Sequence, residues 1–150
     1  NLGGLTGGDG KCQAQADAAG LDGTWKAWLS TSSVNAVDRI YPAGTENTIY
    51  KRLDSKLVAK NKADLIDGSI GNPINLDENS STIQYENVWT GTGSDGEAKN
   101  YHCVSWTSSI GSSSSGAGAV GLANAINKEW TYFSSGVYCN NYFRLYCFEQ

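Results

Sequence analysis

The chain has 150 residues and a formal net charge of −4, and its abundant glycine and serine with five Trp and eight Tyr are typical of a loop-rich secreted domain containing β-strands. This length favours one domain over residues 1–150 with its own buried core, and the negative charge argues against general binding to nucleic acid. The sequence has no apolar run near the roughly 20 residues that span a bilayer, and it shows no signal peptide.

The first predicted element is a helix that begins near Cys12 and ends at Gly20. Asp9 is expected to cap the first turn by accepting from its free amides, and Gly20 suits the left-handed residue that ends a helix. Residues 1–8 are expected to be a flexible lead-in or the end of a first strand. Apolar residues then alternate over 25–29, which predicts a strand with one buried face.

The rest of the chain predicts short elements joined by long loops. Helical turns are expected over residues 34–40 and 61–66. The Ser- and Gly-rich segment 110–121 is expected to be a surface loop. Strands are predicted from apolar patterns between turn residues over 49–53, 57–58, 87–90, 101–107, 130–133, 137–139 and 143–148. With no internal repeat, this order indicates an α+β fold.

Four cysteines predict two disulfides and therefore an oxidising compartment. Their spacing matches neither a zinc ribbon nor a redox Cys-x-x-Cys motif. Four cysteines allow three pairings, and the spacing alone leaves all three open, including a short Cys139–Cys147 bridge. The cysteines are Cys12, Cys103, Cys139 and Cys147.

Several segments, in order along the chain, carry a resemblance to a known family. In the first, a cysteine-bearing helix leads through Gly-Leu-x-Gly-Thr into Trp-Lys-Ala-Trp-Leu-Ser. The others lie at 37–39, 63–68, 88–91 and 145–150. Together they resemble the endostatin-like domain of bacterial surface lipoproteins, best known among leptospiral outer-membrane proteins. The resemblance covers nearly the whole chain.

This resemblance implies a C-type-lectin-like fold: a twisted, mostly antiparallel sheet with two short helices and long loops. It also implies the nested disulfides Cys12–Cys147 and Cys103–Cys139. The implied function is a non-enzymatic extracellular or cell-surface adhesion module, in the outer membrane or periplasm of a bacterium, that recognises host extracellular matrix or complement regulators. A carbohydrate-binding domain and a self-assembling surface or filament subunit are the alternatives.

A basic stretch is the candidate site for an acidic protein or a sulfated glycan. Five of the eleven basic residues lie within twelve positions, and only Asp54 opposes them there, so that the segment is +4 while the remainder is −8. A solvated, charged hairpin is the competing interpretation. The basic residues are Lys51, Arg52, Lys56, Lys60 and Lys62.

Two acidic loops are the candidate calcium ligands, since calcium prefers six to eight oxygen ligands. The first contains Asp77, Glu78 and Asn79, and the second contains Asp95 and Glu97. Many C-type lectins take ligands from these two regions, but the sugar-binding motifs Glu-Pro-Asn and Trp-Asn-Asp are absent. A pair of solvated acidic loops is the alternative, and no other cofactor is expected.

Two aromatic residues complete the candidate ligand-binding set. Trp28 alternates away from Trp25, so it is expected under the first helix or on the surface, while Tyr142 belongs to an aromatic-rich C-terminal segment. Exposed aromatic residues serve both sugar stacking and protein contact. The only histidine, His102, has no nucleophile motif beside it, so no catalytic residues are expected.

Overall fold

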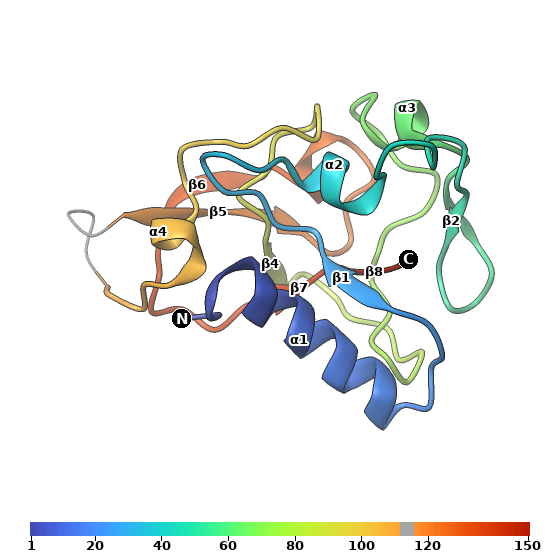
Figure 1. The fold of residues 1–150 in the computed structure, drawn as a ribbon, viewed down its shortest axis with the longest axis horizontal. Helices are drawn as coiled ribbons and strands as arrows, with labels where there is room; N and C mark the ends of the chain where they lie inside the picture. The colour runs from blue at the N-terminus through green and yellow to red at the C-terminus, as the bar shows by residue number, and fades with distance from the viewer. Residues whose placement is uncertain (112–115) are drawn as a thin grey trace.

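A computed structural model describes residues 1–111 and 116–150 as an α+β fold with mostly antiparallel sheets (Figure 1). One two-stranded sheet pairs β1 (Trp25–Ala27) with β8 (Cys147–Glu149), and another pairs β2 (Tyr50–Lys51) with β3 (Leu57–Ala59). The third sheet has the order β6 (Ser134–Tyr138), β5 (Ala117–Leu122), β4 (Asn87–Trp89) and β7 (Arg144–Leu145). All pairings are antiparallel except that of β4 with β7.

One long helix crosses the front of the molecule and the others are single turns (Figure 1). The long helix packs on β1, and the chain ends at the other side of β1, in β8. None of the helices in the described ranges is long and apolar enough to cross a membrane. The helices are α1 (Gly4–Ala18), α2 (Ala36–Ile40), α3 (Lys62–Leu65), α4 (Cys103–Trp106) and the 3-10 turn η2 (Lys128–Trp130).

The helix α1 begins earlier than its sequence predicts. Residues 4–8 are the first turn of the helix, so the expected flexible lead-in is wrong, and Asp9 lies inside the helix instead of capping it. Glycines are poor helix formers, but a Cβ at Gly8 would lie 2.8 Å from Leu29 Cδ1. The glycine therefore lets the helix pack closely on β1, and this packing compensates for its low propensity. Gly20 follows the helix with φ 69°, as predicted.

The predicted strand over residues 25–29, which contains β1, has buried side chains on both faces rather than one. Ala27 and Leu29 belong to a core beneath α1 that also contains Trp89 and Trp106. Trp28 points the other way into a second core, where it has no exposed surface. The prediction of Trp28 as a ligand-binding residue is therefore wrong, because no ligand can reach its ring.

The predicted strand over residues 101–107 is instead a left-handed turn. Cys103, Val104, Ser105 and Trp106 all have φ between 50° and 67°. Valine is unfavourable in this region because its Cβ crowds the following carbonyl. The turn is held by the bond from Trp106 Nε1 to Ser30 O at 2.8 Å and by the disulfide at Cys103.

Two further predictions near the C-terminus are wrong. The Gly- and Ser-rich segment predicted as a loop contributes β5, a central strand, and residues 112–115 of that segment lie outside the described residues. A Cβ at Gly118 would lie 2.2 Å from the Trp89 ring, so glycine is required there by close packing. The predicted strand over 130–133 begins instead within η2.

The two disulfides join Cys12 to Cys147 and Cys103 to Cys139. This is the nested pairing that the resemblance implied. The first bond ties α1 to the last strand, and the second ties α4 to the segment after β6. The described residues contain no free cysteine.

Candidate ligand-binding groove

A groove of about 1010 Å³ lies along the last strand. In Figure 1, β8 ends between α1 below and β2 to the right. The groove is therefore assembled from parts of the chain that no local sequence pattern connects. Its walls come from residues 11–25, 48–53, 74–83 and 144–150.

The wall formed by β2 is fixed to β8 by an edge-to-face contact between two aromatic side chains. The ring of Tyr50 meets the ring of Phe148 edge-on, with centroids 4.9 Å apart, and its hydroxyl donates to Ile40 O at 3.0 Å. Burial raises the pKa of Tyr50, so the hydroxyl stays protonated and keeps this bond at neutral pH. The position of the β2 wall relative to β8 is therefore set by packing.

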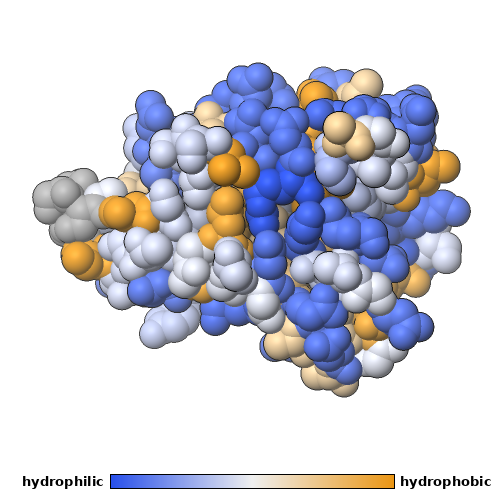
Figure 2. All heavy atoms as spheres, in the orientation of Figure 1, coloured by the Kyte–Doolittle hydropathy of each residue, from blue (hydrophilic) through white to orange (hydrophobic). Residues whose placement is uncertain are grey.

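Exposed apolar side chains line the β2 side of the groove. Ile49 is 56% exposed and Leu53 is 40% exposed, and both line it. Figure 2 shows orange, hydrophobic spheres along the right margin, over β2 and β3, on a face that is otherwise mostly hydrophilic or neutral. Large apolar side chains left in water beside a hollow are typical of a binding surface.

The charges along the groove are mixed in sign. Four cations (Lys11, Lys51, Arg52, Arg144) and four anions (Asp22, Asp77, Glu78, Glu149) line it. The guanidinium of Arg144 is 2.6 Å from Glu86, and this bond is the main cause that raises its pKa, with smaller contributions from Asp77 and Glu78. The β7 end of the groove therefore carries more negative than positive charge.

The basic stretch is largely neutralised by ion pairs. Arg52 and Lys56 both contact Asp54, Lys60 contacts Asp64, and Lys62 contacts Asp38. Asp64 and Asp38 lie outside the basic stretch, where the sequence set only Asp54 against the five basic residues. In the part of the chain that the structure describes, Lys51 alone of the five basic residues has no ion-pair partner. Lys51 and Arg52 line the groove, whereas Lys56, Lys60 and Lys62 do not.

These ion pairs and the hydrogen bonds beside them also lower the pKa values of the acids. The hydrogen bond from Lys62 lowers the pKa of Asp38, and that from Arg52 lowers the pKa of Asp54 far below its usual range. The backbone N–H of Lys60 is the main cause that lowers the pKa of Asp64. All three carboxylates are therefore charged at neutral pH and offset the lysines beside them.

The candidate calcium ligands do not form a shared site. Among residues 1–111 and 116–150, no three His, Cys, Asp or Glu side chains lie close enough together to hold a metal ion. Asp77 Oδ1 accepts from the backbone N–H groups of Asn79 and Ser81, and Asp95 pairs with Lys99 at 2.8 Å. Each carboxylate therefore stabilises its own loop.

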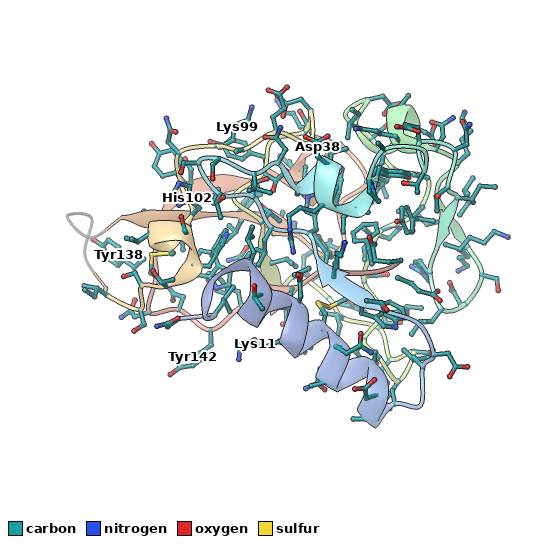
Figure 3. The ribbon with its side chains drawn as sticks, viewed as in Figure 1. Lys11, Asp38, Lys99, His102, Tyr138 and Tyr142 are labelled. Carbon is teal, nitrogen blue, oxygen red and sulfur yellow. A yellow bond between two sulfur atoms is a disulfide. The ribbon has the colours of Figure 1, made fainter. Side chains whose placement is uncertain are left out.

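The remaining candidates lie away from the groove. Tyr142 is 99% exposed and projects from the lower left of the molecule in Figure 3, far from β8. His102 lies beside α4 in the same figure, where its Nδ1 accepts from the Ser105 backbone N–H at 2.9 Å. This histidine therefore has a structural role at the start of the left-handed turn.

The sequence predicted neither the groove nor the role of Arg39, whose guanidinium positions α1 against the groove. The guanidinium of Arg39 donates to both carboxylate oxygens of Asp9, at 2.6 and 2.7 Å, and to Ala27 O at 2.6 Å. Asp9 also accepts from the Ala27 backbone N–H. The spacing of 30 residues between the two charges gives no local signal of this pair.

A family model described as "Protein of unknown function (DUF1554)" matches residues 1–126. The match extends from α1 through β5 and includes three of the four walls of the groove. No curated protein matches the chain.

Proposed function

The chain belongs to the DUF1554 family, and we propose that it is a non-enzymatic extracellular module that binds other proteins through the groove along β8. The observation that carries this proposal is a groove of about 1010 Å³ with exposed Ile49 and Leu53 on one wall. Extracellular-matrix proteins or complement regulators of a host are the proposed partners, on the basis of the resemblance to surface lipoproteins. The two disulfides support a location outside the cytoplasm.

We also propose that the fold is C-type-lectin-like, of the endostatin-like kind. Two features support this assignment. The first and last strands pair with each other, and one disulfide joins the first helix to the last strand while the other lies within that span. Periplasmic or outer-membrane placement in a bacterium is part of the same proposal.

The test compares protein binding by the full chain and by two matched variants. Immobilised matrix proteins and complement regulators are probed with the native chain, with Ile49→Asp and with Ile126→Asp. Ile126 is 51% exposed, close to the 56% of Ile49, but it does not line the groove. Binding should fall at least tenfold for Ile49→Asp and stay unchanged for Ile126→Asp. Equal binding by all three would refute a role for the groove.

Two controls separate the alternative functions. A glycan array with and without calcium tests carbohydrate binding, and sedimentation at several concentrations tests self-association. Binding to glycans without any protein ligand, or a concentration-dependent increase in mass that Ile49→Asp leaves intact, would favour the corresponding alternative over protein binding.

A further inference from the structure

We propose that the groove binds an extended polypeptide segment of another protein, which adds as a strand to the free edge of β8. This inference rests on the proposed function and specifies its partner. Addition of a strand to an open sheet edge is a general way to recognise peptides, because main-chain hydrogen bonds supply affinity while side-chain pockets supply specificity.

The register of β8 shows which of its backbone groups are free. Phe148 is opposite Lys26 in β1. On either side of it, Tyr146 O accepts from Trp28 N at 2.9 Å, and Gln150 N donates to Thr24 O at 2.8 Å. Even-numbered residues therefore direct their backbone groups toward β1, and because these directions alternate along a strand, Cys147 and Glu149 direct theirs away from it.

The outward groups of these two residues have little else to bind. The only strand paired with β8 is β1 in the described part of the chain. There, neither residue's N–H nor the Cys147 carbonyl has a hydrogen-bond partner, and the Glu149 carbonyl accepts only from the side chain of Gln150. Both residues line the groove. The groove therefore contains two outward donors and two outward acceptors with the spacing of a strand.

The other strand that borders this last segment, β4, lies on the same side of it as β1. β4 runs parallel to β7, with Trp89 opposite Leu145. Thr90, the residue after β4, donates its N–H to Ala119 O in β5, and its carbonyl accepts from the N–H of Ser30 in the segment after β1. Even-numbered residues of the β4 segment therefore face β5, so Trp89 faces β7 and meets it on the side that β1 occupies further along. A guest strand would therefore add on the opposite side of β8, where Cys147 and Glu149 direct their backbone groups, without displacing either β1 or β4.

The two sides of the groove specify the guest's side chains. Tyr146 and Phe148 point into the second core, against which Ile74 and Ile83 also pack, so one side of the edge is apolar. Cys147 points the other way, toward α1 and the first core. Since side chains alternate along a strand, the guest should alternate apolar residues on the Ile74 side with polar residues on the α1 side.

Charge at one end of the groove adds a further preference. Glu86 neutralises Arg144, which leaves Asp77 and Glu78 as excess negative charge at the β7 end. A Lys or Arg at that end of the guest would be attracted there. The occupant is therefore an extended segment of another protein, with alternating apolar and polar side chains and a basic residue. A second copy of this chain does not fit, because its own β8 edge is enclosed by the walls of its own groove.

The edge can be altered without touching the pairing of β8 with β1. Proline lacks the N–H group and is tolerated on an edge whose N–H faces away from the sheet. Glu149→Pro removes an outward N–H, whereas Glu149→Gln keeps it and serves as the control. The probe is a phage-displayed library of random heptapeptides, panned on the full oxidised chain, and the enriched peptides are synthesised for affinity measurement.

The proposal expects enrichment of alternating apolar and polar residues with a Lys or Arg. Glu149→Pro should weaken the enriched peptides at least tenfold and Glu149→Gln less than twofold. Methylation of alternate peptide nitrogens should abolish binding in one register and leave it unchanged in the other, which tests the hydrogen bonds even if Glu149→Pro fails to fold. On binding, the amides of Cys147 and Glu149 should become protected from hydrogen exchange.

Some outcomes would overturn this inference alone. If Ile49→Asp abolishes binding to whole proteins but no heptapeptide is enriched, the groove binds a folded surface and strand addition is refuted. Enriched peptides that bind equally well with either set of alternate nitrogens methylated would also refute it. If peptides bind as expected but no whole protein does, strand addition stands and the proposed matrix or complement partners are wrong.

Discussion

At the residue scale, the most constrained charged group is Arg39, which joins three elements. Its guanidinium binds Asp9 in α1 and the carbonyls of Ala27 and Leu29 at the end of β1, from its own place in α2. Its side chain is only 10% exposed. This is the planar, multiply bonded arrangement that lysine cannot reproduce.

Arg39→Lys should lower the free energy of unfolding by about 1–3 kcal/mol, because several charge-assisted hydrogen bonds are lost in a partly buried site. Urea denaturation measures the change. Lys62→Gln is the control, since its ion pair with Asp38 is exposed and such pairs contribute about 0–1 kcal/mol. Equal destabilisation by the two changes would contradict this role of Arg39.

The ion pairs of the basic stretch predict that removing their acids will strengthen binding to heparin. Changing Asp38, Asp54 and Asp64 together to Asn should increase retention on heparin at pH 7, because the paired basic groups lose their countercharges. The increase should disappear at high salt, which screens exposed charges. Unchanged retention would mean that these acids do not mask the basic stretch.

The same carboxylates predict how stability depends on pH. Their pKa values are lowered in the folded chain, so their contribution is fully present above the unfolded value of about 4 and is lost as pH falls through the folded values. Thermal unfolding between pH 7 and pH 2 should show stability falling only below about pH 4. The triple Asn variant should show a shallower fall, and an identical profile would contradict the assignment.

At the element scale, α4 is the strained part of the fold. Val104 has φ 53° and ψ 59° and is 53% exposed. A left-handed conformation costs a β-branched residue roughly 1–2 kcal/mol. The disulfide at Cys103 and the buried Trp106 hold the turn in place, so the strain is balanced by packing around it.

Val104→Asn should raise the melting temperature, since asparagine tolerates the left-handed region better than valine. The expected gain is about 1 kcal/mol. Val137→Asn is the matched control: Val137 lies in β6 with an ordinary backbone, and asparagine is unfavourable in strands, so this change should destabilise. A lower melting temperature for Val104→Asn would contradict the left-handed turn.

At the scale of the whole molecule, the sequence predicts the pieces that have local signals. Gly20 ends α1, the helical turn expected over residues 61–66 is present as α3, and the turn at Asp54 joins β2 to β3. The strand β4 and the α+β class are also as predicted.

What the sequence does not predict depends on long-range packing. Gly8 in α1 and Gly118 in β5 look like loop residues, but glycine is required there because the backbone passes close to Leu29 and to the Trp89 ring respectively. Trp28 is buried because β1 lies between two cores. The groove joins four distant segments, so no local pattern could indicate it.

The disulfides should differ in their contribution to stability. In the chain-entropy model, the Cys12–Cys147 bond closes the longer loop, with a separation of 135 against 36 for Cys103–Cys139. Replacing each pair by serine should therefore cost about 5 and about 4 kcal/mol respectively. Denaturant unfolding measures both, and a larger loss for Cys103–Cys139 would contradict this order.

The central claim is that β8 has an open edge along the groove, and residue-resolved hydrogen exchange of the unliganded chain tests it most directly. The amides of Phe148 and Gln150 bond to β1 and should exchange slowly, whereas those of Cys147 and Glu149 face the groove and should exchange at least tenfold faster. Equal protection of all four amides would show that the edge is already occupied, and it would contradict the account of this groove as a peptide-binding site.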